Sequence, residues 1–295
     1  MKIHKYAAID IGSNGVRLLI SNVIEFNKKE TQFKKSSLIR VPIRLGEDVF
    51  TTGKISDNNK HRICDAMQAF QLIMKLYDVE KYKACATSAM REAKNNQEIV
   101  TEVYNRTGVR IDIINGKTEA EIISSTDLSD LIQNDQSYLY VDVGGGSTEF
   151  TFFSNGKLID SRSFPLGTVR LLDNKVDDHV WDDAKRWIKE ISNDLPKLSL
   201  IGSGGNINKI FKMSGKSEDK PLSYIYLNSY YNFLNQMSYN QRISELDLNP
   251  DRADVIIPAA KIYVQAMKWS GAKKIYVPKI GLSDGIIKSL YMGKL

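Results

Sequence analysis

The sequence YLYVDVGGGSTE, residues 138–149, decides the fold, because an apolar strand runs into an aspartate and then into three consecutive glycines. Glycine loses more conformational entropy on folding than any other residue, so three in a row indicate that a ligand approaches the backbone closely. The backbone N–H groups of such a turn, with the hydroxyls of Ser147 and Thr148, can bind phosphate oxygens. A tight hairpin turn without a ligand is the alternative for this loop taken alone.

A second copy of this pattern lies near the N-terminus, in YAAIDIGSNGVRLLI at residues 6–20. A strand ends at Asp10, a turn of residues that tolerate left-handed backbone angles follows, and another apolar strand begins. Asp142 holds the equivalent place in the first-quoted stretch. A repeat spaced by almost half the chain is too long for a solenoid and predicts two similar lobes, with phosphate held between two facing hairpins.

The rest of the chain alternates between helical and extended apolar patterns, which predicts an α/β fold. Asn95 and Glu98 are expected to form a capping box at the start of one helix. Helices are expected at residues 57–77, 95–108, 181–195, from 206, and 253–269, and strands at residues 82–90, 109–114, 198–202 and 275–281.

Composition points to a water-soluble globular protein, with 295 residues, 42% hydrophobic residues and a formal net charge of +6. No apolar run is long enough to span a membrane, and Asp10 interrupts the N-terminal apolar stretch too early for a signal peptide, so a cytoplasmic location is expected. Cys64 and Cys85 are expected to be core thiols. The mild positive charge suits an anionic partner, while the lysine pairs indicate solvated faces and argue against nucleic acid.

Three carboxylates near the glycine turns, Asp10, Asp142 and Glu149, are candidate ligands for Mg²⁺, which binds through one or two carboxylates plus substrate phosphates. The alternative is that each aspartate only hydrogen-bonds its own turn. The three histidines are scattered without metal-ligand spacing, so zinc is not expected.

The segment NGKTEAEII, residues 115–123, contains two glutamates with different expected roles. With Thr118 as N-cap, Glu121 would close a capping box and Glu119 would occupy the first helical position. There the helix N-terminus favours an ionised carboxylate, which is a candidate base for activating water. On spacing alone, a solvated first-turn glutamate remains the favoured interpretation of Glu119.

Two further segments carry candidate anion ligands. Arg91 follows a predicted buried strand and could offer its forked donors to phosphate, with a surface salt bridge as the alternative. Gly204 and Gly205 lie where IGSGGNINKIF passes from strand to helix, a geometry that either binds anions or only allows close packing. Neither a GxGxxG nor a Walker A motif is present.

Taken together, these motifs resemble the exopolyphosphatase/guanosine pentaphosphate phosphohydrolase (Ppx/GppA) family. The resemblance implies an actin-like ATPase (ribonuclease H-like) fold, with two similar lobes around a cleft, and Mg²⁺-dependent hydrolysis of the terminal phosphate of polyphosphate or guanosine pentaphosphate. The matching segments, in order, are AIDIGSNGVRLLI, ATSAMREAKN, NGKTEAEII, YVDVGGGSTEF, PLGTVRLL, IGSGGNI and RADVIIPAAKI.

The resemblance also implies residue roles. It implies that Glu119 is the catalytic base, although spacing alone favours a solvated glutamate. It also implies that Glu149 binds the metal, with help from Asp142 or Asp10. The phosphate-binding residues that follow from the matches and the glycine turns are Asp10, Gly12, Ser13, Asn14, Arg91, Gly144, Gly145, Gly146, Ser147, Gly204 and Gly205.

The lobes are expected to comprise residues 1–124, joined by a C-terminal helix at about 284–295, and residues 125–283. The chain resembles short family members without a C-terminal HD-type domain, and a homodimer is compatible with it. Gly15, Asn206 and Ser283-Asp284 depart from the family pattern and leave the substrate open. Two alternatives remain, a non-catalytic sensor of polyphosphate or guanosine tetraphosphate and a kinase of the same superfold.

Overall fold

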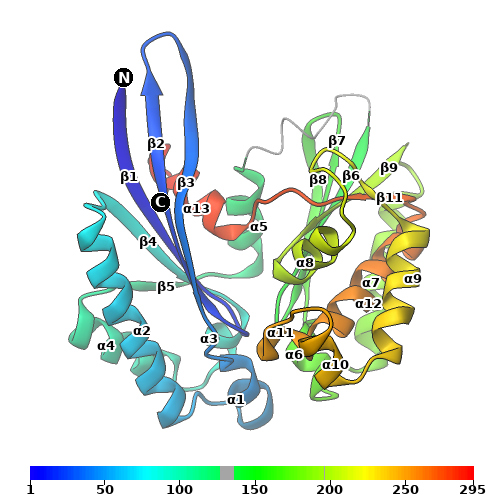
Figure 1. The fold of residues 1–295 in the computed structure, drawn as a ribbon, viewed down its shortest axis with the longest axis horizontal. Coiled ribbons are helices and arrows are strands. Elements are labelled where there is room, and N and C mark those ends of the chain that lie inside the picture. Colours follow the sequence, from blue (N-terminus) through cyan, green and yellow to red (C-terminus); the bar gives the residue numbers. More distant parts are fainter. Residues whose placement is uncertain (127–135, 196) are drawn as a thin grey trace. The chain divides into compact units, whose positions relative to one another are not determined.

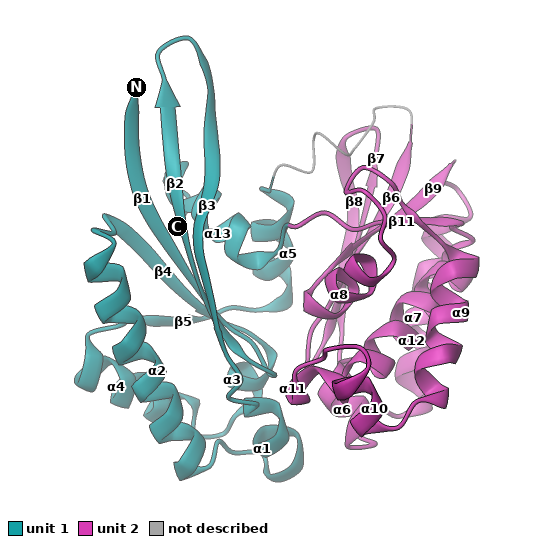
Figure 2. Ribbon diagram, viewed as in Figure 1, with its two compact units in different colours: residues 1–126, 280–295 teal, residues 127–279 magenta. Residues whose placement is uncertain are grey.

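The computed structural model describes residues 1–126, 136–195 and 197–295, which form two compact units. Unit 1 comprises Met1–Thr126 and Ile280–Leu295, and unit 2 comprises Asp127–Lys279 (Figure 2). The sequence had placed these boundaries at residues 124 and 284. Within the described ranges, every helix is too short or too polar to cross a membrane.

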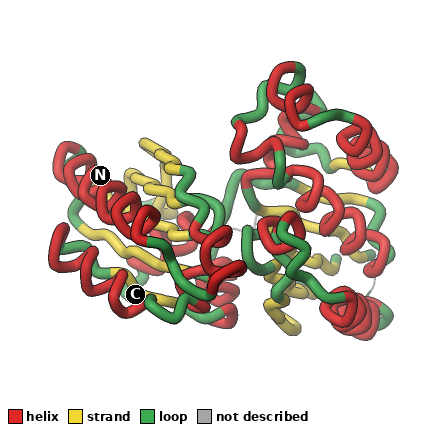
Figure 3. The backbone as a smooth tube through the Cα atoms, turned by 90° about the horizontal axis from the view of Figure 1, so that it is seen from below, coloured by secondary structure: helices red, strands yellow, loops and turns green. Residues whose placement is uncertain are grey.

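Unit 1 is a five-stranded mixed sheet in the order β3-β2-β1-β4-β5, with helices on both faces (Figures 1 and 3). The first three strands form an antiparallel meander, and β4 and β5 are parallel to β1. Its elements are β1 (Lys2–Ile11), β2 (Val16–Phe26), β3 (Lys29–Val41), α1 (Leu45–Thr52), α2 (Asp57–Leu76), β4 (Lys81–Ala86), α3 (Ser88–Glu92), α4 (Asn96–Thr107), β5 (Ile111–Ile113), α5 (Gly116–Ser124) and α13 (Leu282–Tyr291).

Unit 2 repeats this topology in its sheet, of order β10-β11-β9-β6-β7-β8. The meander β6-β7-β8 corresponds to β1-β2-β3, while β9 and β11 take the places of β4 and β5. Its elements are β6 (Ser137–Val143), β7 (Thr148–Ser154), β8 (Lys157–Phe164), α6 (Thr168–Leu172), α7 (Asp178–Ser192), β9 (Leu198–Ser203), α8 (Gly205–Met213), β10 (Leu222–Ser223), α9 (Tyr224–Gln236), α10 (Tyr239–Ser244), α11 (Pro250–Ala253), α12 (Ile256–Ser270) and β11 (Lys274–Tyr276).

The repeated βββαβα topology confirms the predicted actin-like ATPase fold class. Apolar periodicity predicted the helices correctly. In α2, the residues Ile63, Met67 and Phe70 recur at helical spacing and are buried against the apolar face of the unit 1 sheet. Cys64 and Cys85 are free and buried, as predicted.

Several local expectations were wrong. The predicted strand at 82–90 ends at Ala86, so Arg91 lies on helix α3 rather than at a strand end. The capping box of Asn95 and Glu98 does not form, because the Asn95 side chain bonds the backbone of Ile55 at 2.9 and 3.0 Å. The Asn95 side chain, which local spacing had assigned to capping, therefore makes a tertiary contact instead.

Candidate active site

The turn of the first hairpin, between β1 and β2, presents backbone N–H groups on one side. A hydrogen bond from Gly12 N–H to the Gly15 carbonyl closes the turn at 3.2 Å. The carbonyls of Ser13 and Asn14 accept from backbone N–H groups at the start of α1, at 2.8 and 3.2 Å. A trans peptide directs its C=O and N–H oppositely, so the amides of Asn14 and Gly15 point away from α1.

The turn of the second hairpin, between β6 and β7, is built in the same way. Gly144 N–H donates to the Ser147 carbonyl at 2.9 Å, and the carbonyls of Gly144 and Gly145 accept from N–H groups at the start of α6, at 3.0 and 2.8 Å. The Gly146 carbonyl accepts from Arg170 Nε at 2.6 Å. Three consecutive amides, those of Gly145, Gly146 and Ser147, therefore point away from α6, as an anion-binding turn requires.

Each turn is braced by a glycine near the start of the helix behind it. A β carbon on Gly167 would lie 2.3 Å from the Gly145 carbonyl oxygen, so only glycine fits where the chain enters α6. At Gly46, in α1, a β carbon would lie 2.7 Å from the Phe50 ring and 3.1 Å from the Ser13 β carbon. The close approach fixes the direction of the turn amides.

Asp10 is paired with an arginine. Across the β1–β2 ladder its partner is Arg17, whose Nη1 lies 3.2 Å from Asp10 Oδ2. Burial raises the pKa of Asp10, and the Arg17 guanidinium opposes that rise. The charge of this carboxylate is therefore partly balanced within unit 1.

Glu119 is buried, with 7% of its surface exposed. Burial raises the pKa of the Cys85 thiol to about 12, and the charges of Asp10 and Glu119 add to that rise. Cys85 is the parallel-strand partner of Asp10, so the strand-end aspartate and this thiol are neighbours in the unit 1 sheet.

The helix that carries Glu119 begins earlier than predicted. Asn115, not Thr118, is the N-cap of α5, and its side chain accepts from Thr118 N–H at 2.8 Å. Glu119 is consequently the fourth helical residue, and Glu121 is exposed instead of closing a capping box. Counting residues could not show at which residue α5 begins, and therefore did not show that Glu119 is buried.

Arg91 and Ser13 hold this region of unit 1 together. The Arg91 guanidinium donates through Nη1 to the Ile114 carbonyl at 2.8 Å, directly before the N-cap of α5. Ser13 Oγ accepts from Ala89 N–H in α3 at 3.2 Å, which leaves its hydroxyl proton as a donor. Both predicted phosphate ligands therefore also have structural contacts.

In unit 2, Asp142 and Glu149 are cross-strand partners, which places their side chains on the same face. Glu149 is 3% exposed, and its Oε1 accepts from the Ser147 and Ser163 hydroxyls at 2.6 and 2.9 Å. Gly204, with a φ of 114°, lies beside Asp142, and a β carbon there would be in van der Waals contact with Oδ1 at 3.5 Å.

The model of the Ppx/GppA phosphatase family matches residues 23–292. The chain belongs to the Ppx/GppA phosphatase family. The match begins within β2, after the turn of the first hairpin, but curated relatives align over nearly the whole chain.

Among these relatives, a bifunctional 3-dehydroquinate synthase/phosphatase of Fusobacterium nucleatum is 30% identical over 97% of this chain, which spans 46% of that protein. Exopolyphosphatase 2 of Mycobacterium tuberculosis is 24% identical, covering 98% of this chain and 99% of the relative. An exopolyphosphatase structure from Cytophaga hutchinsonii has a TM-score of 0.82 at 22% identity and 98% coverage of both chains, which shows the common fold.

A metal ion would need help from the substrate in this Ppx/GppA family member. Among residues 1–126, 136–195 and 197–295, no three His, Cys, Asp or Glu side chains are grouped closely enough to hold one alone. Two adjacent carboxylates, Asp142 and Glu149, nevertheless fit Mg²⁺, which usually takes its other ligands from phosphates and water.

Some residues of the Ppx/GppA site were missed by sequence reasoning. Ser163 contacts Glu149 from β8, and its surroundings gave no local signal. Gly167 and Arg170 lie in PLGTVRLL, which had contributed to the family resemblance without a role. Their function as a brace depends on contacts with a turn that lies 20 or more residues earlier.

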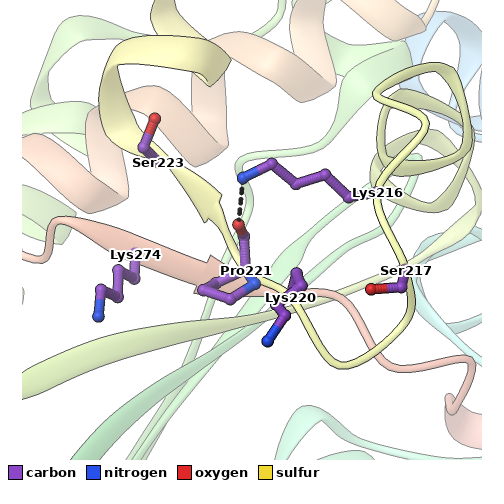
Figure 4. A pocket seen from close by; sticks show the side chains of 6 residues that line it. All are labelled: Lys216, Ser217, Lys220, Pro221, Ser223 and Lys274. Atoms are coloured by element: carbon purple, nitrogen blue, oxygen red, sulfur yellow. Dashed lines mark hydrogen bonds between the residues drawn. The ribbon is translucent and has the colours of Figure 1, made fainter.

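A separate pocket of about 490 Å³ in unit 2 is lined by none of the predicted site residues (Figure 4). Lys216 donates to the Pro221 carbonyl at 2.9 Å, and Lys220 pairs with Asp219 at 3.3 Å. These contacts tie down the loop after α8. The pocket lining comprises Lys216, Ser217, Lys220, Pro221, Ser223 and Lys274.

Proposed function

We propose that this protein is a phosphoanhydride hydrolase that releases terminal phosphate from inorganic polyphosphate, guanosine pentaphosphate, or both. The observation that carries the proposal is the buried carboxylate of Glu119, in the first turn of α5. A glutamate withdrawn from bulk water suits the orientation and deprotonation of a water molecule. The exopolyphosphatase names of several relatives support polyphosphate as the substrate.

The residues of each unit have distinct parts in this mechanism. In unit 2, the amides of Gly145, Gly146 and Ser147 would bind phosphate oxygens without reorganising during the reaction. In unit 1, Glu119 would take the proton of the attacking water. Most of the catalysis would then come from positioning and electrostatic stabilisation, as in other phosphoryl transfers.

Asp142 and Glu149 would hold Mg²⁺ together with the substrate phosphates. The bound ion would neutralise charge on the phosphate oxygens. The Ser147 and Ser163 hydroxyls orient the Glu149 carboxylate for this role, since both donate to the same oxygen.

The test is phosphate release with Mg²⁺ from long polyphosphate, tripolyphosphate, guanosine pentaphosphate and ATP in parallel. Glu119→Gln is expected to lower kcat by about 10²–10⁴-fold, the usual contribution of a general base. Glu121→Gln is the matched control, because Glu121 is on the same helix and exposed. It should keep wild-type activity.

Full activity of Glu119→Gln would reject the base. Binding of the same compounds without release by the wild type would identify a sensor. Turnover of ATP only with an added acceptor would identify a kinase.

A further inference from the structure

Gly15 makes room for an arginine beside the first hairpin. A β carbon on Gly15 would lie 3.1 Å from Arg40 Nη2 and 3.2 Å from both Cζ and Nε of the same side chain. The guanidinium therefore occupies the space that a side chain at position 15 would take.

Arg40 belongs to the functional face of the unit 1 sheet. It is the cross-strand partner of Arg17, which is the partner of Asp10, so the three side chains share one face. Gly15 lies directly before β2, and its contact with the Arg40 guanidinium places it beside this face. Val16 and Leu18, which alternate with them, are buried in the apolar core on the opposite face.

The equivalent residue in unit 2 already contacts a candidate functional group. Arg40 corresponds to Ser163, because Ser163 is the cross-strand partner of Glu149 as Arg40 is of Arg17. The Ser163 hydroxyl donates to the Glu149 carboxylate at 2.9 Å. In both units, the side chain at this position of the meander therefore contacts a residue at or next to the hairpin turn.

We propose that Arg40 is a phosphate-binding residue of the first hairpin, and that its guanidinium uses the space left by the missing side chain at Gly15. The forked donors of arginine match phosphate oxygens better than a single hydroxyl, and the charge adds to that of Arg17. The inference rests on the proposed function only in requiring a phosphoanhydride substrate.

The experiment compares Arg40→Gln, Arg40→Lys, Gly15→Ser and the double variant Arg40→Gln/Gly15→Ser, with Arg110→Gln as control. Arg110 is exposed and stacks on Tyr104, so it tests the loss of one surface charge. Tripolyphosphate binding is measured by calorimetry in the Glu119→Gln background, and KM and kcat are measured with Glu119 intact. Thermal melting checks folding.

Arg40→Gln is expected to weaken binding and raise KM by about 10- to 100-fold, with a smaller change in kcat, as for the loss of a charged hydrogen bond. Arg40→Lys should recover part of the affinity. Gly15→Ser should weaken binding in the wild type by displacing the guanidinium, yet strengthen it in the Arg40→Gln background, where the shorter side chain lacks the Cζ and Nη atoms and leaves room for the hydroxyl. A purely structural role would not reverse this sign.

Folded Arg40 variants with unchanged affinity and KM, or changed no more than Arg110→Gln, would overturn the role of Arg40 while leaving the hydrolase intact. Binding without turnover by the protein that retains Glu119 would instead reject the hydrolase, and the dissociation constants would still test Arg40. A wild-type protein that neither binds nor hydrolyses tripolyphosphate would reject both.

Discussion

The two glycine hairpins share a backbone and differ in charge. Both close with the same hydrogen bond, from Gly12 to Gly15 and from Gly144 to Ser147, and both are braced by the start of the helix after the meander. Across the ladder, however, the strand-end aspartate faces an arginine in unit 1 and a glutamate in unit 2.

This difference assigns different chemistry to equivalent positions. In unit 1, Arg17 balances Asp10, and a second guanidinium lies beside the turn, so the hairpin favours anions. In unit 2, Asp142 and Glu149 are cross-strand partners, so two carboxylates lie beside the turn whose amides would bind phosphate. The repeat therefore supplies one scaffold twice, and under the proposed function Mg²⁺ would be bound at the second hairpin alone.

The largest expected effect tests the metal assignment. Glu149→Gln should lower phosphate release by about 100-fold or more at limiting Mg²⁺, since even residues supporting a ligand change metal affinity by about 10–100-fold. Asp10→Asn, at the equivalent hairpin, should leave the Mg²⁺ concentration for half-maximal activity unchanged, although activity falls.

Titrating Mg²⁺ in the release assay measures both half-maximal concentrations. A larger shift in Asp10→Asn than in Glu149→Gln would reverse the division between the hairpins.

A second comparison concerns the glycines that brace the turns. Gly167→Ala should destabilise the fold by about 3 kcal/mol, because its β carbon would meet a backbone oxygen that cannot move without the turn. Gly46→Ala should cost about 1 kcal/mol, because the partly exposed Phe50 ring can shift. Urea unfolding of both variants gives the difference, and equal costs would show that the second turn is less rigidly held than its contacts imply.

The smallest expected effect concerns the Asp10–Arg17 pair. Arg17→Gln should destabilise the protein by about 1–2 kcal/mol, less than a fully buried pair, because the Arg17 side chain is 38% exposed. Without the guanidinium, burial raises the pKa of Asp10 further. A raised folded-state pKa means that stability is lost as pH rises, so the deficit should be larger at about pH 8 than at about pH 5.

Urea unfolding of Arg17→Gln and wild type at both pH values checks the sign. Asp10→Asn/Arg17→Gln serves as control and should lose the pH dependence of the deficit. A deficit that grows on acidification would contradict the burial of an ionised Asp10.

Local sequence patterns predicted the repeated hairpins and most elements, but not the contacts that complete the site. Apolar alternation identified β1, β6 and β9, and helical periodicity identified α2 and α12, because burial of one face imposes the period. The start of α5 was misplaced because Asn115 and Thr118 are both good N-caps, and the structure shows that Asn115 is the one that caps, by accepting from Thr118 N–H.

What the sequence alone determined is the doubled strand–aspartate–turn pattern, since glycine, aspartate and apolar alternation act through local backbone geometry. The tertiary structure decided which residues stand across from these turns. Arg17 and Glu149 follow their turns in sequence, but Arg40, Ser163 and Gly167 reach them only through strand pairing and packing. Register between strands is set by the whole apolar core, so only the paired sheets show which charged side chains lie beside each hairpin turn.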